Sequence, residues 1–408
     1  MSNQKLKSTE IITYCGDKNR VEVAINAGAT HLILDHPMFS IRSLLKDYSS
    51  NFEQHYTQLS QFAKSLKSDI KLSIQCDLIM HQEHEKDLLQ LAAFLNQLKP
   101  DYIRLQDQGL ISFFKIYCPQ IKLSYMQEMG NANTESVKAY SNHVDRQQFS
   151  LDLTYDDMEK INQVVKTKYD CFIQGPILIQ HSKRRYLAGM DEEASPDSIK
   201  LIHRIAQDEE YPGRLFDFYD NQHGHFMFAY FDRSLLRHIT DLVSLNLSGW
   251  IIDARGESDH YLKTSLELYI SELKIYLKSP STYQFDRTHL ETLLKVARKP
   301  QKPGFFKANQ TDRQRYNTYL PNESEYLKIG RVLDIIKGKR ITIELTQEIN
   351  TQTILYAFHP KCDGLILNCE KLWDLKNNLV KQSTGNRLIQ INWVKGIQQN
   401  SQLFIKQV

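Results

Sequence analysis

The sequence lacks the features of extracellular, membrane-spanning and nucleic-acid-coating proteins. Its six cysteines include no CxxC pair, which disfavours a disulfide framework and a four-ligand zinc site. No stretch approaches the roughly 20 uncharged apolar residues of a membrane-spanning helix, and the polar start MSNQKLKSTE has no signal-peptide core. Charges nearly cancel, with 51 Lys and Arg against 48 Asp and Glu, which argues against a general nucleic-acid coat. We therefore expect a cytoplasmic protein with reduced cysteines and no membrane contact.

The sequence also contains none of the familiar catalytic motifs. It has no GxGxxG fingerprint, no Walker loop and no GxSxG elbow, and no Ser/His/Asp or Cys/His set stands out. Asp17, Asp35, His36 and Asp77 carry suitable donor atoms for a divalent metal, but no HExxH-type spacing supports such a site. We predict no metal site, and the catalytic residues stay unassigned.

What the sequence does contain is an alternation of short β-rich runs and longer helical patterns over residues 8–280. Alternation of this kind predicts a parallel sheet, and eight such units fit a closed (β/α)8 TIM-like barrel, so the fold class is α/β. The eight predicted strands lie at residues 10–15, 31–35, 70–76, 102–106, 121–125, 148–152, 170–174 and 249–253.

Two further segments are predicted outside the regular barrel. The gap before the last strand is long, which predicts an insertion at about 178–245 that contains a strand near 223–231. Residues 281–325 are rich in Pro and Lys and are predicted to form a linker. Residues 326–408 consist of short β-rich runs and predict a small, β-barrel-like domain.

Polar residues follow every predicted strand of the barrel. Functional groups of such barrels gather at the carboxyl ends of the strands, so these residues predict a polar, ligand-binding barrel mouth. In the alternative interpretation, each acid merely caps the following helix or forms an Asx turn. The candidate mouth residues are Asp17, Asp35, Asp77, Asp107, Gln127, Asp152, Gln174, Asp253 and Arg255.

The clearest local signal is the basic run Lys183-Arg184-Arg185, which follows the seventh strand. It has two interpretations: a solvated loop, or a clamp for phosphate or carboxylate groups of RNA or another anion. Arg214 would join this clamp through the insertion. The basic and aromatic segment 305–319 would extend the same surface to nucleic acid, or else form part of the linker.

Several segments, taken in order, resemble the collagenase-like peptidases of family U32. DCFIQG (170–175) stands where that family has Glu-x-Phe-x-His-Gly, and IIDARG (251–256) where it has Lys-Ile-Glu-Gly-Arg. The resemblance covers almost the whole chain and implies a barrel-like region with a C-terminal extension. Other matching segments are INAGATHLIL (25–34), Phe39 to Arg42, LQDQGL (105–110), Gln127 with Asn133, SLDL (150–153) and PGFF (303–306).

The resemblance implies two kinds of activity. The older family label is protease, whereas better-understood relatives are similar to iron–sulfur proteins that support hydroxylation of tRNA or rRNA bases, or of ubiquinone precursors. Four cysteines hold the cluster in those relatives. Here the corresponding positions fall at Leu178, Arg185, near Glu209 and at Gly213. Because none of these residues is Cys, we expect that the cluster is lost and that the protein has no cofactor.

These observations lead to one functional expectation and two alternatives. We expect a divergent family member that acts in RNA modification, as an enzyme or as an accessory subunit, with RNA or a protein as partner. Asp152 and Asp253 keep the charge of the family's glutamates, and Arg255 is retained, which favours a small-molecule ligand in the mouth. The alternatives are a peptidase and a non-catalytic binding module, and altered signature residues such as Gln174 favour the latter.

Overall fold

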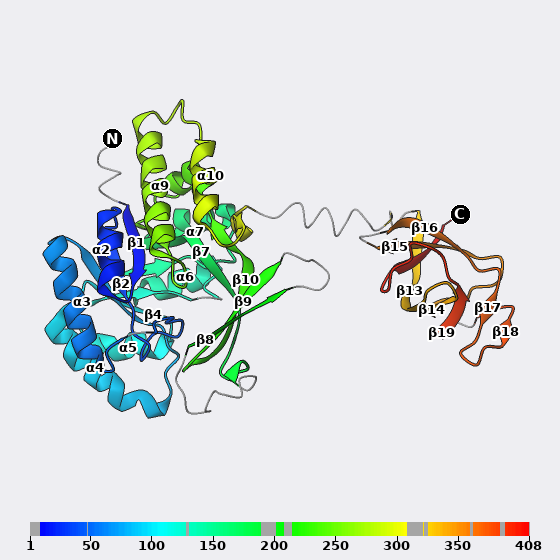
Figure 1. The fold of residues 1–408 in the computed structure, drawn as a ribbon, viewed down its shortest axis with the longest axis horizontal. Helices are drawn as coiled ribbons and strands as arrows, with labels where there is room; N and C mark the ends of the chain where they lie inside the picture. Colours follow the sequence, from blue (N-terminus) through cyan, green and yellow to red (C-terminus); the bar gives the residue numbers. More distant parts are fainter. Residues whose placement is uncertain are drawn as a thin grey trace. The chain divides into compact units, whose positions relative to one another are not determined.

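The structure is a computed structural model with two compact units, Met1–Ala308 and Asn309–Val408. Each unit has its own hydrophobic core and is described separately below. Figure 1 identifies their helices and strands. The residues that the structure describes are 9–46, 48–127, 130–188, 201–207, 214–307, 321, 325–359, 362–383 and 388–407.

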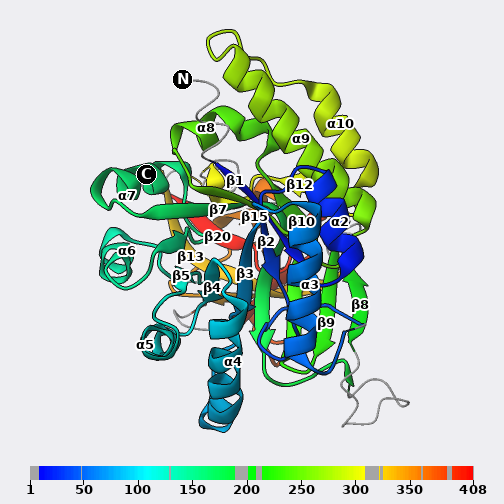
Figure 2. The same ribbon diagram turned by 90° about the vertical axis from the view of Figure 1, so that its left-hand side faces the viewer.

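The first unit contains a closed barrel of eight parallel strands. The barrel closes because β11 pairs with both β1 and β7, while the other strands pair in chain order. Figure 2 shows the helices arranged around these strands. The barrel strands are β1 (Glu10–Cys15), β2 (His31–Leu34), β3 (Lys71–Cys76), β4 (Tyr102–Leu105), β5 (Lys122–Tyr125), β6 (Arg146–Gln148), β7 (Lys168–Ser182) and β11 (Gly249–Ile252).

The helices alternate with the strands, which confirms the predicted TIM-like barrel. Apolar residues on the inner faces of the helices, such as Tyr56, Leu91 and Phe114, pack against the outside of the strands. The helices are α2 (Lys18–Asn26), α3 (Phe52–Leu66), α4 (Glu85–Leu98), α5 (Gln108–Tyr117), α6 (Thr134–Ser141), α7 (Tyr155–Val164), α8 (Ile239–Ser244) and α9 (Asp259–Lys278).

The sixth strand lies earlier in the chain than the sequence predicted. The prediction was 148–152, whereas β6 ends at Gln148. The amide of Leu153 donates to the carbonyl of Ser150 at 3.3 Å, so the chain already turns where the strand was expected. The alternating apolar residues Phe149 and Leu151 imitated a strand across this turn.

The insertion begins as a direct extension of β7. This strand continues well past the barrel wall and pairs with β10 (Gly224–Ser234), which in turn pairs with β9 (Leu215–Asn221). β8 (Ile202–Gln207) forms the outer edge, so the inserted strands lie side by side (Figure 1). The predicted strand near 223–231 is therefore part of β10.

Gly175 marks the point at which β7 leaves the barrel. Its φ is +133°, and an ideal Cβ at this position would lie 2.2 Å from the carbonyl oxygen of Asp253. A side chain is excluded both by the backbone conformation and by this close approach. The glycine therefore lets the strand pass directly against the end of β11.

The first unit extends into the predicted linker. α10 (Arg287–Val296) packs against α9, and β12 (Gln301–Lys302) pairs with β10. Phe306 is fully buried against the same core. Residues 281–307 are thus folded, while 308–320 lie outside the described residues.

The second unit is a small antiparallel β-domain. Its eight strands pair in the order β16-β15-β20-β13-β14-β19-β17-β18, and one face covers a core of aliphatic side chains. The strands are β13 (Tyr326–Ile336), β14 (Arg340–Leu345), β15 (Ile354–His359), β16 (Cys362–Asn368), β17 (Leu372–Trp373), β18 (Leu379–Val380), β19 (Leu388–Asn392) and β20 (Gln402–Lys406).

A buried charge network fills the amino end of the barrel. The guanidinium of Arg146 donates to Glu10 at 2.6 Å and to Asp170 at 2.7 Å, and it lies over the ring of Tyr102. His31 joins Glu10 at 2.9 Å. Burial raises the pKa of Glu10, but the bonds from His31 and Arg146 outweigh this and hold the pKa well below its usual value. This carboxylate therefore stabilises the fold at neutral pH, and that contribution is lost in strong acid.

We predict that Arg146→Met strongly destabilises the first unit. The substitution leaves the buried Asp170 without its ion-pair partner, although Glu10 keeps Lys71 and His31, and it should cost about 3–5 kcal/mol of the free energy of unfolding. Lys263→Met, which removes an exposed pair with Glu267, should cost less than about 0.5 kcal/mol. Urea unfolding of both variants measures the difference, and equal costs would contradict the structural role of Arg146.

A charged pocket at the barrel mouth

Three of the predicted acids meet at the carboxyl end of the barrel. Asp35, Asp77 and Asp253 follow β2, β3 and β11, and each is at most 2% exposed. They converge because parallel strands end at the same face of the barrel. Buried carboxylates require partners, and the surrounding residues supply them in different ways.

Asp253 is neutralised by two arginines. Arg255 donates to its carboxylate at 2.7 Å and 3.0 Å, and Arg42 donates at 2.9 Å from the segment after β2. The guanidinium of Arg255 also lies 3.7 Å from the ring centre of Tyr14. Burial raises the pKa of Asp253, but Arg255 and Arg42 outweigh it and keep the pKa below its usual value. This ion-pair cluster therefore remains charged at neutral pH.

Asp35 lies in a different electrostatic environment. Its Oδ2 is 3.6 Å from Arg255, and its buried carboxyl also interacts with the side chain of Ser40. Burial raises the pKa of Asp35, and the attraction of Arg255 offsets this only in part. A carboxyl of this kind can take up a proton and then donate it to a bound group.

A pocket of about 410 Å³ opens beside these residues. Tyr14, Asp35 and Arg255 form its floor, and Leu44 and Leu45 from the segment after β2 form an apolar wall. An ideal Cβ at Gly16 would lie 2.2 Å from Leu45, so this segment crosses closely over the end of β1. Seven of its twelve lining residues are charged, so the pocket is mainly polar, with the two leucines as its apolar side.

Asp77, Asp17 and Asp107 hold backbone amides. Asp77 accepts a bond from the amide of Ile41 at 2.9 Å and so fixes the segment after β2. Asp17 caps α2 through the amide of Arg20, and Asp107 caps α5 through the amide of Gly109. The bonds of Asp17 and Asp107 fit the helix-capping interpretation, although Asp17 also lines the rim of the pocket.

Of the nine predicted mouth residues, Asp17, Asp35 and Arg255 line this pocket, and the other six do not. Asp152 is exposed in the turn after β6, and Gln127 is half-buried beyond β5. Gln174 is fully buried, but its side chain contacts Tyr261 at 2.5 Å, and Tyr261 belongs to α9 outside the barrel. A bulge between β7 and β11 at Gln174 changes the alternation of side chains there.

Sequence reasoning missed several residues of the mouth. Arg42 appeared only as part of a family match, and Tyr14 and Leu45 were not considered. The position of Tyr14 could have been predicted. Side chains alternate along a strand, so Tyr14 points into the barrel on β1 as Ile12 does two residues earlier. Arg42 and Leu45 lie beyond a strand end, where no periodic signal places a side chain.

The four predicted cations do not form one cluster. Lys183 and Arg184 are exposed at the far end of β7, where the Lys183 amine contacts His81. Arg214 instead lies over the ring of Tyr230, 5.0 Å from its centre. Ser182, next to Lys183, pairs with His225, which lies five residues before Tyr230 on β10. The basic run and Arg214 are therefore about 17 Å apart along this strand. Arg185 is half-buried next to the first group.

The residues at the family's cluster positions do not fit an iron–sulfur cluster. Leu178 and Arg185 offer no thiolate, and the positions near Glu209 and at Gly213 lie outside the described residues. The five cysteines with described side chains are buried singly, and burial raises the pKa of the Cys171 thiol. Within the described ranges, no group of three His, Cys, Asp or Glu side chains is arranged to bind a metal.

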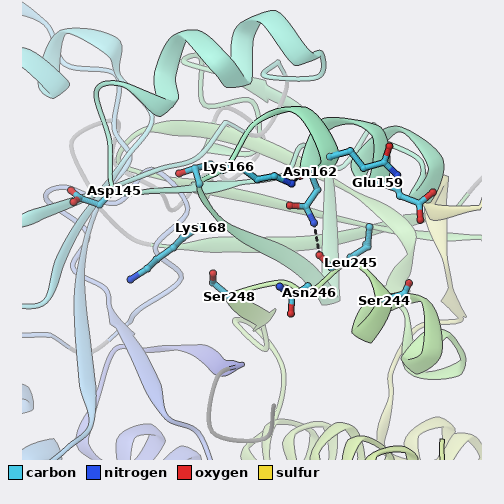
Figure 3. A pocket seen from close by; sticks show the side chains of 11 residues that line it. Asp145, Glu159, Asn162, Lys166, Lys168, Ser244, Leu245, Asn246 and Ser248 are labelled. Atoms are coloured by element: carbon cyan, nitrogen blue, oxygen red, sulfur yellow. Dashed lines mark hydrogen bonds between the residues drawn. The ribbon is translucent and has the colours of Figure 1, made fainter. Parts of the chain in front are cut away.

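A second pocket, of about 770 Å³, lies at the opposite end of the barrel (Figure 3). It is lined by residues at the amino ends of strands, including Asp145, Lys168 and Ser248, and by Asn162, which donates to the carbonyl of Leu245 at 2.6 Å. Figure 3 shows Lys166 and Lys168 on one side of this hollow. Barrel enzymes place their chemistry at the carboxyl ends of the strands, so we favour the smaller pocket as the functional site.

These features define a class: an α/β barrel with a charged mouth, an inserted sheet before its last strand and a separate β-domain. The model of peptidase family U32 matches residues 16–316, and the chain belongs to this family. The family resemblance seen in the sequence is thereby confirmed. Among the parts of the chain described, no helix has the length and apolarity needed to cross a membrane.

Two relatives illustrate what the chain is similar to. It is 18% identical over 380 residues to tRNA hydroxylation protein P1 of Bacillus subtilis (strain 168), covering 91% of this chain and 88% of that protein. It is 18% identical over 350 residues to tRNA hydroxylation protein P of Escherichia coli (strain K12), covering 74% and 75%.

Solved structures give weaker matches. The C-terminal domain of a U32 peptidase from Geobacillus thermoleovorans is 15% identical, with a TM-score of 0.19, and the match covers 22% of this chain and 99% of that domain. Tryptophan synthase from Pyrococcus furiosus is 12% identical, with a TM-score of 0.34, covering 70% and 98%.

We predict that Arg255→Met destabilises the barrel. Asp253 would stay buried with Arg42 as its remaining cation, which costs about 3–5 kcal/mol of the free energy of unfolding. Arg184→Met changes an exposed arginine and should cost less than about 0.5 kcal/mol. Chemical denaturation measures both, and a fully stable Arg255→Met protein would show that the ion pair is dispensable.

We predict that Asp35 makes the fold less stable as the pH rises. Because its pKa is raised in the folded state, the native protein binds more protons than the unfolded chain above about pH 4, and stability falls with increasing pH. Asp35→Asn cannot ionise and should lose less stability between acid and neutral pH. Urea unfolding at several pH values tests this, with Asp152→Asn as an exposed control that should follow the wild type.

Proposed function

We propose that this chain is a tRNA-modification protein that acts in the cytoplasm. The observation that carries the proposal is the match to tRNA hydroxylation protein P1 along 91% of the chain. The chain takes part in modification either as the enzyme or as an accessory subunit. The name of the family supports a peptidase, but no observation in the described part of the mouth favours that reaction.

The mouth pocket supports a ligand-binding role in this process. Tyr14 and the leucine wall offer apolar contacts, while Asp35 and Arg255 bring charge to the same pocket. Arg255 is held in place by Asp253 and is therefore oriented before any ligand arrives. We propose that a small molecule binds here and that the protein works without an iron–sulfur cluster.

We predict that a strain without this gene lacks one hydroxylated nucleoside in its tRNA. Mass spectrometry of digested tRNA from the deletion strain measures the loss, and the wild-type gene on a plasmid should restore it. Asp35→Asn should restore it less well, because this side chain in the pocket lining can no longer ionise. Asp152→Asn is the matched control and should restore it fully.

Three outcomes would count against the proposal. Unchanged tRNA nucleosides in the deletion strain would remove the role in modification. Protein purified anaerobically should show no visible absorption from iron and sulfide, and a brown protein would refute the absence of a cluster. Gelatin cleavage by the pure protein would favour the peptidase instead.

A further inference from the structure

The charge of the chain is divided unevenly along its length. Residues 326–408 contain 12 Lys and Arg against six Asp and Glu, a net charge of +6. Residues 1–325 contain 39 against 42, a net charge of −3. The insertion at 178–245, which carries the basic run, contains eight against 11 and is also net negative. A polyanion is therefore attracted to the C-terminal β-domain rather than to the insertion.

The C-terminal sheet carries aromatic residues on the face opposite its core. Side chains alternate along a strand, and on β20 Leu403 belongs to the core, so the neighbouring Phe404 points to the other face. On β15 the core residue is Ala357, and Tyr356 and Phe358 point away from it. The two strands are paired, so these aromatic residues lie next to one another.

Four rings form a connected cluster on this outer face. Tyr326 makes edge contacts with Tyr356 and Phe358, with ring centres 5.3 Å and 5.7 Å apart, and Phe358 contacts Phe404 at 5.4 Å. Phe358 and Phe404 are only 6% and 5% exposed, whereas the two tyrosines are half-exposed. The buried phenylalanines thus hold two partly exposed tyrosines in fixed positions.

Two lysines flank the rings. Lys328 pairs directly with Phe404, and Lys406 pairs with Tyr326, so each lysine stands beside an aromatic residue on the same face. Both lysines are exposed. We call this set the aromatic–lysine patch; it consists of Tyr326, Lys328, Tyr356, Phe358, Phe404 and Lys406.

We propose that the aromatic–lysine patch binds single-stranded RNA. Bases stack on Tyr326 and Tyr356, and the ammonium groups of Lys328 and Lys406 contact the phosphates. Sheets with exposed aromatic residues hold two or three bases of an unpaired RNA segment in this way, and the positive domain supplies the long-range attraction. The inference rests on the proposed function, since a tRNA offers such unpaired segments in its loops.

Charge substitutions test the phosphate contacts. Fluorescence anisotropy of the full chain with a labelled oligouridine gives the dissociation constant at several salt concentrations. Lys328→Gln with Lys406→Gln should weaken binding and lower the slope of log K against log salt by about 1.4, or 0.7 for each phosphate contact on a single strand. Lys183→Gln with Arg184→Gln is the matched control, with the same change of charge on the insertion, and should leave the slope unchanged.

Aromatic substitutions test the stacking. Tyr326→Leu with Tyr356→Leu keeps apolar side chains at these positions but removes the rings, and should weaken binding about 10-fold or more without changing the salt slope. Tyr117→Leu, an exposed aromatic change on α5, should bind as the wild type does. Ultraviolet crosslinking of RNA to the wild-type chain, followed by mass spectrometry, should place nucleotides on peptides that contain Tyr326 or Tyr356.

Several results would overturn the proposal. The proposal is wrong if the wild-type chain does not bind the oligouridine. It is also wrong if the insertion control weakens binding as much as the patch variants do. The patch would be a general polyanion-binding surface if heparin displaced the oligouridine as well as unlabelled RNA does and if the tyrosine variants bound RNA like the wild type. Crosslinks confined to the first unit would place the RNA elsewhere, even if the tyrosine variants do not fold.

The proposed function and this inference can fail separately. If the deletion strain loses its tRNA hydroxylation but the patch variants bind RNA normally, the proposed function stands and the inference is wrong. If the patch binds RNA but tRNA from the deletion strain is unchanged, the domain is an RNA-binding module and the proposed function is wrong.

Discussion

The buried carboxylate of Asp253 imposes the main constraint on the barrel mouth. A charge that is shielded from water must be paired, and Arg255 and Arg42 approach Asp253 from two different segments of the chain. Arg255 then rests on the ring of Tyr14, which joins the end of β1 to the end of β11. The floor of the pocket is therefore built from one ion-pair cluster, and its shape depends on that cluster remaining intact.

The barrel could be predicted from the sequence because its strands form short apolar runs between helical patterns. Asp35, Asp77 and Asp253 could be expected at the mouth, since each lies just past a strand end and continues the inward-facing alternation of its strand. Gln174 follows the same rule in sequence, but the bulge in β7 directs it toward α9. The pocket wall from the segment after β2 could not be predicted, because it depends on bonds such as that between Asp77 and the amide of Ile41.

The two units differ in where their charged and aromatic residues lie. The barrel contains the buried charges and the pocket, whereas the β-domain contains the excess of positive charge and the two half-exposed tyrosine rings. The basic run, which is the strongest local signal in the sequence, lies on an insertion with more acids than bases. A short run of like charges is therefore a weaker guide to a polyanion surface than the charge of the whole domain.

Gly175 is the place where the strand that leads into the inserted sheet passes closest to the backbone of the mouth. The strand that leaves the barrel touches the carbonyl oxygen of Asp253, the same residue that orients Arg255. There is no room for even one methyl group between them. A tilt of the inserted sheet would thus press on the backbone of the residue that holds the pocket floor, so the sheet and the pocket must move together or not at all.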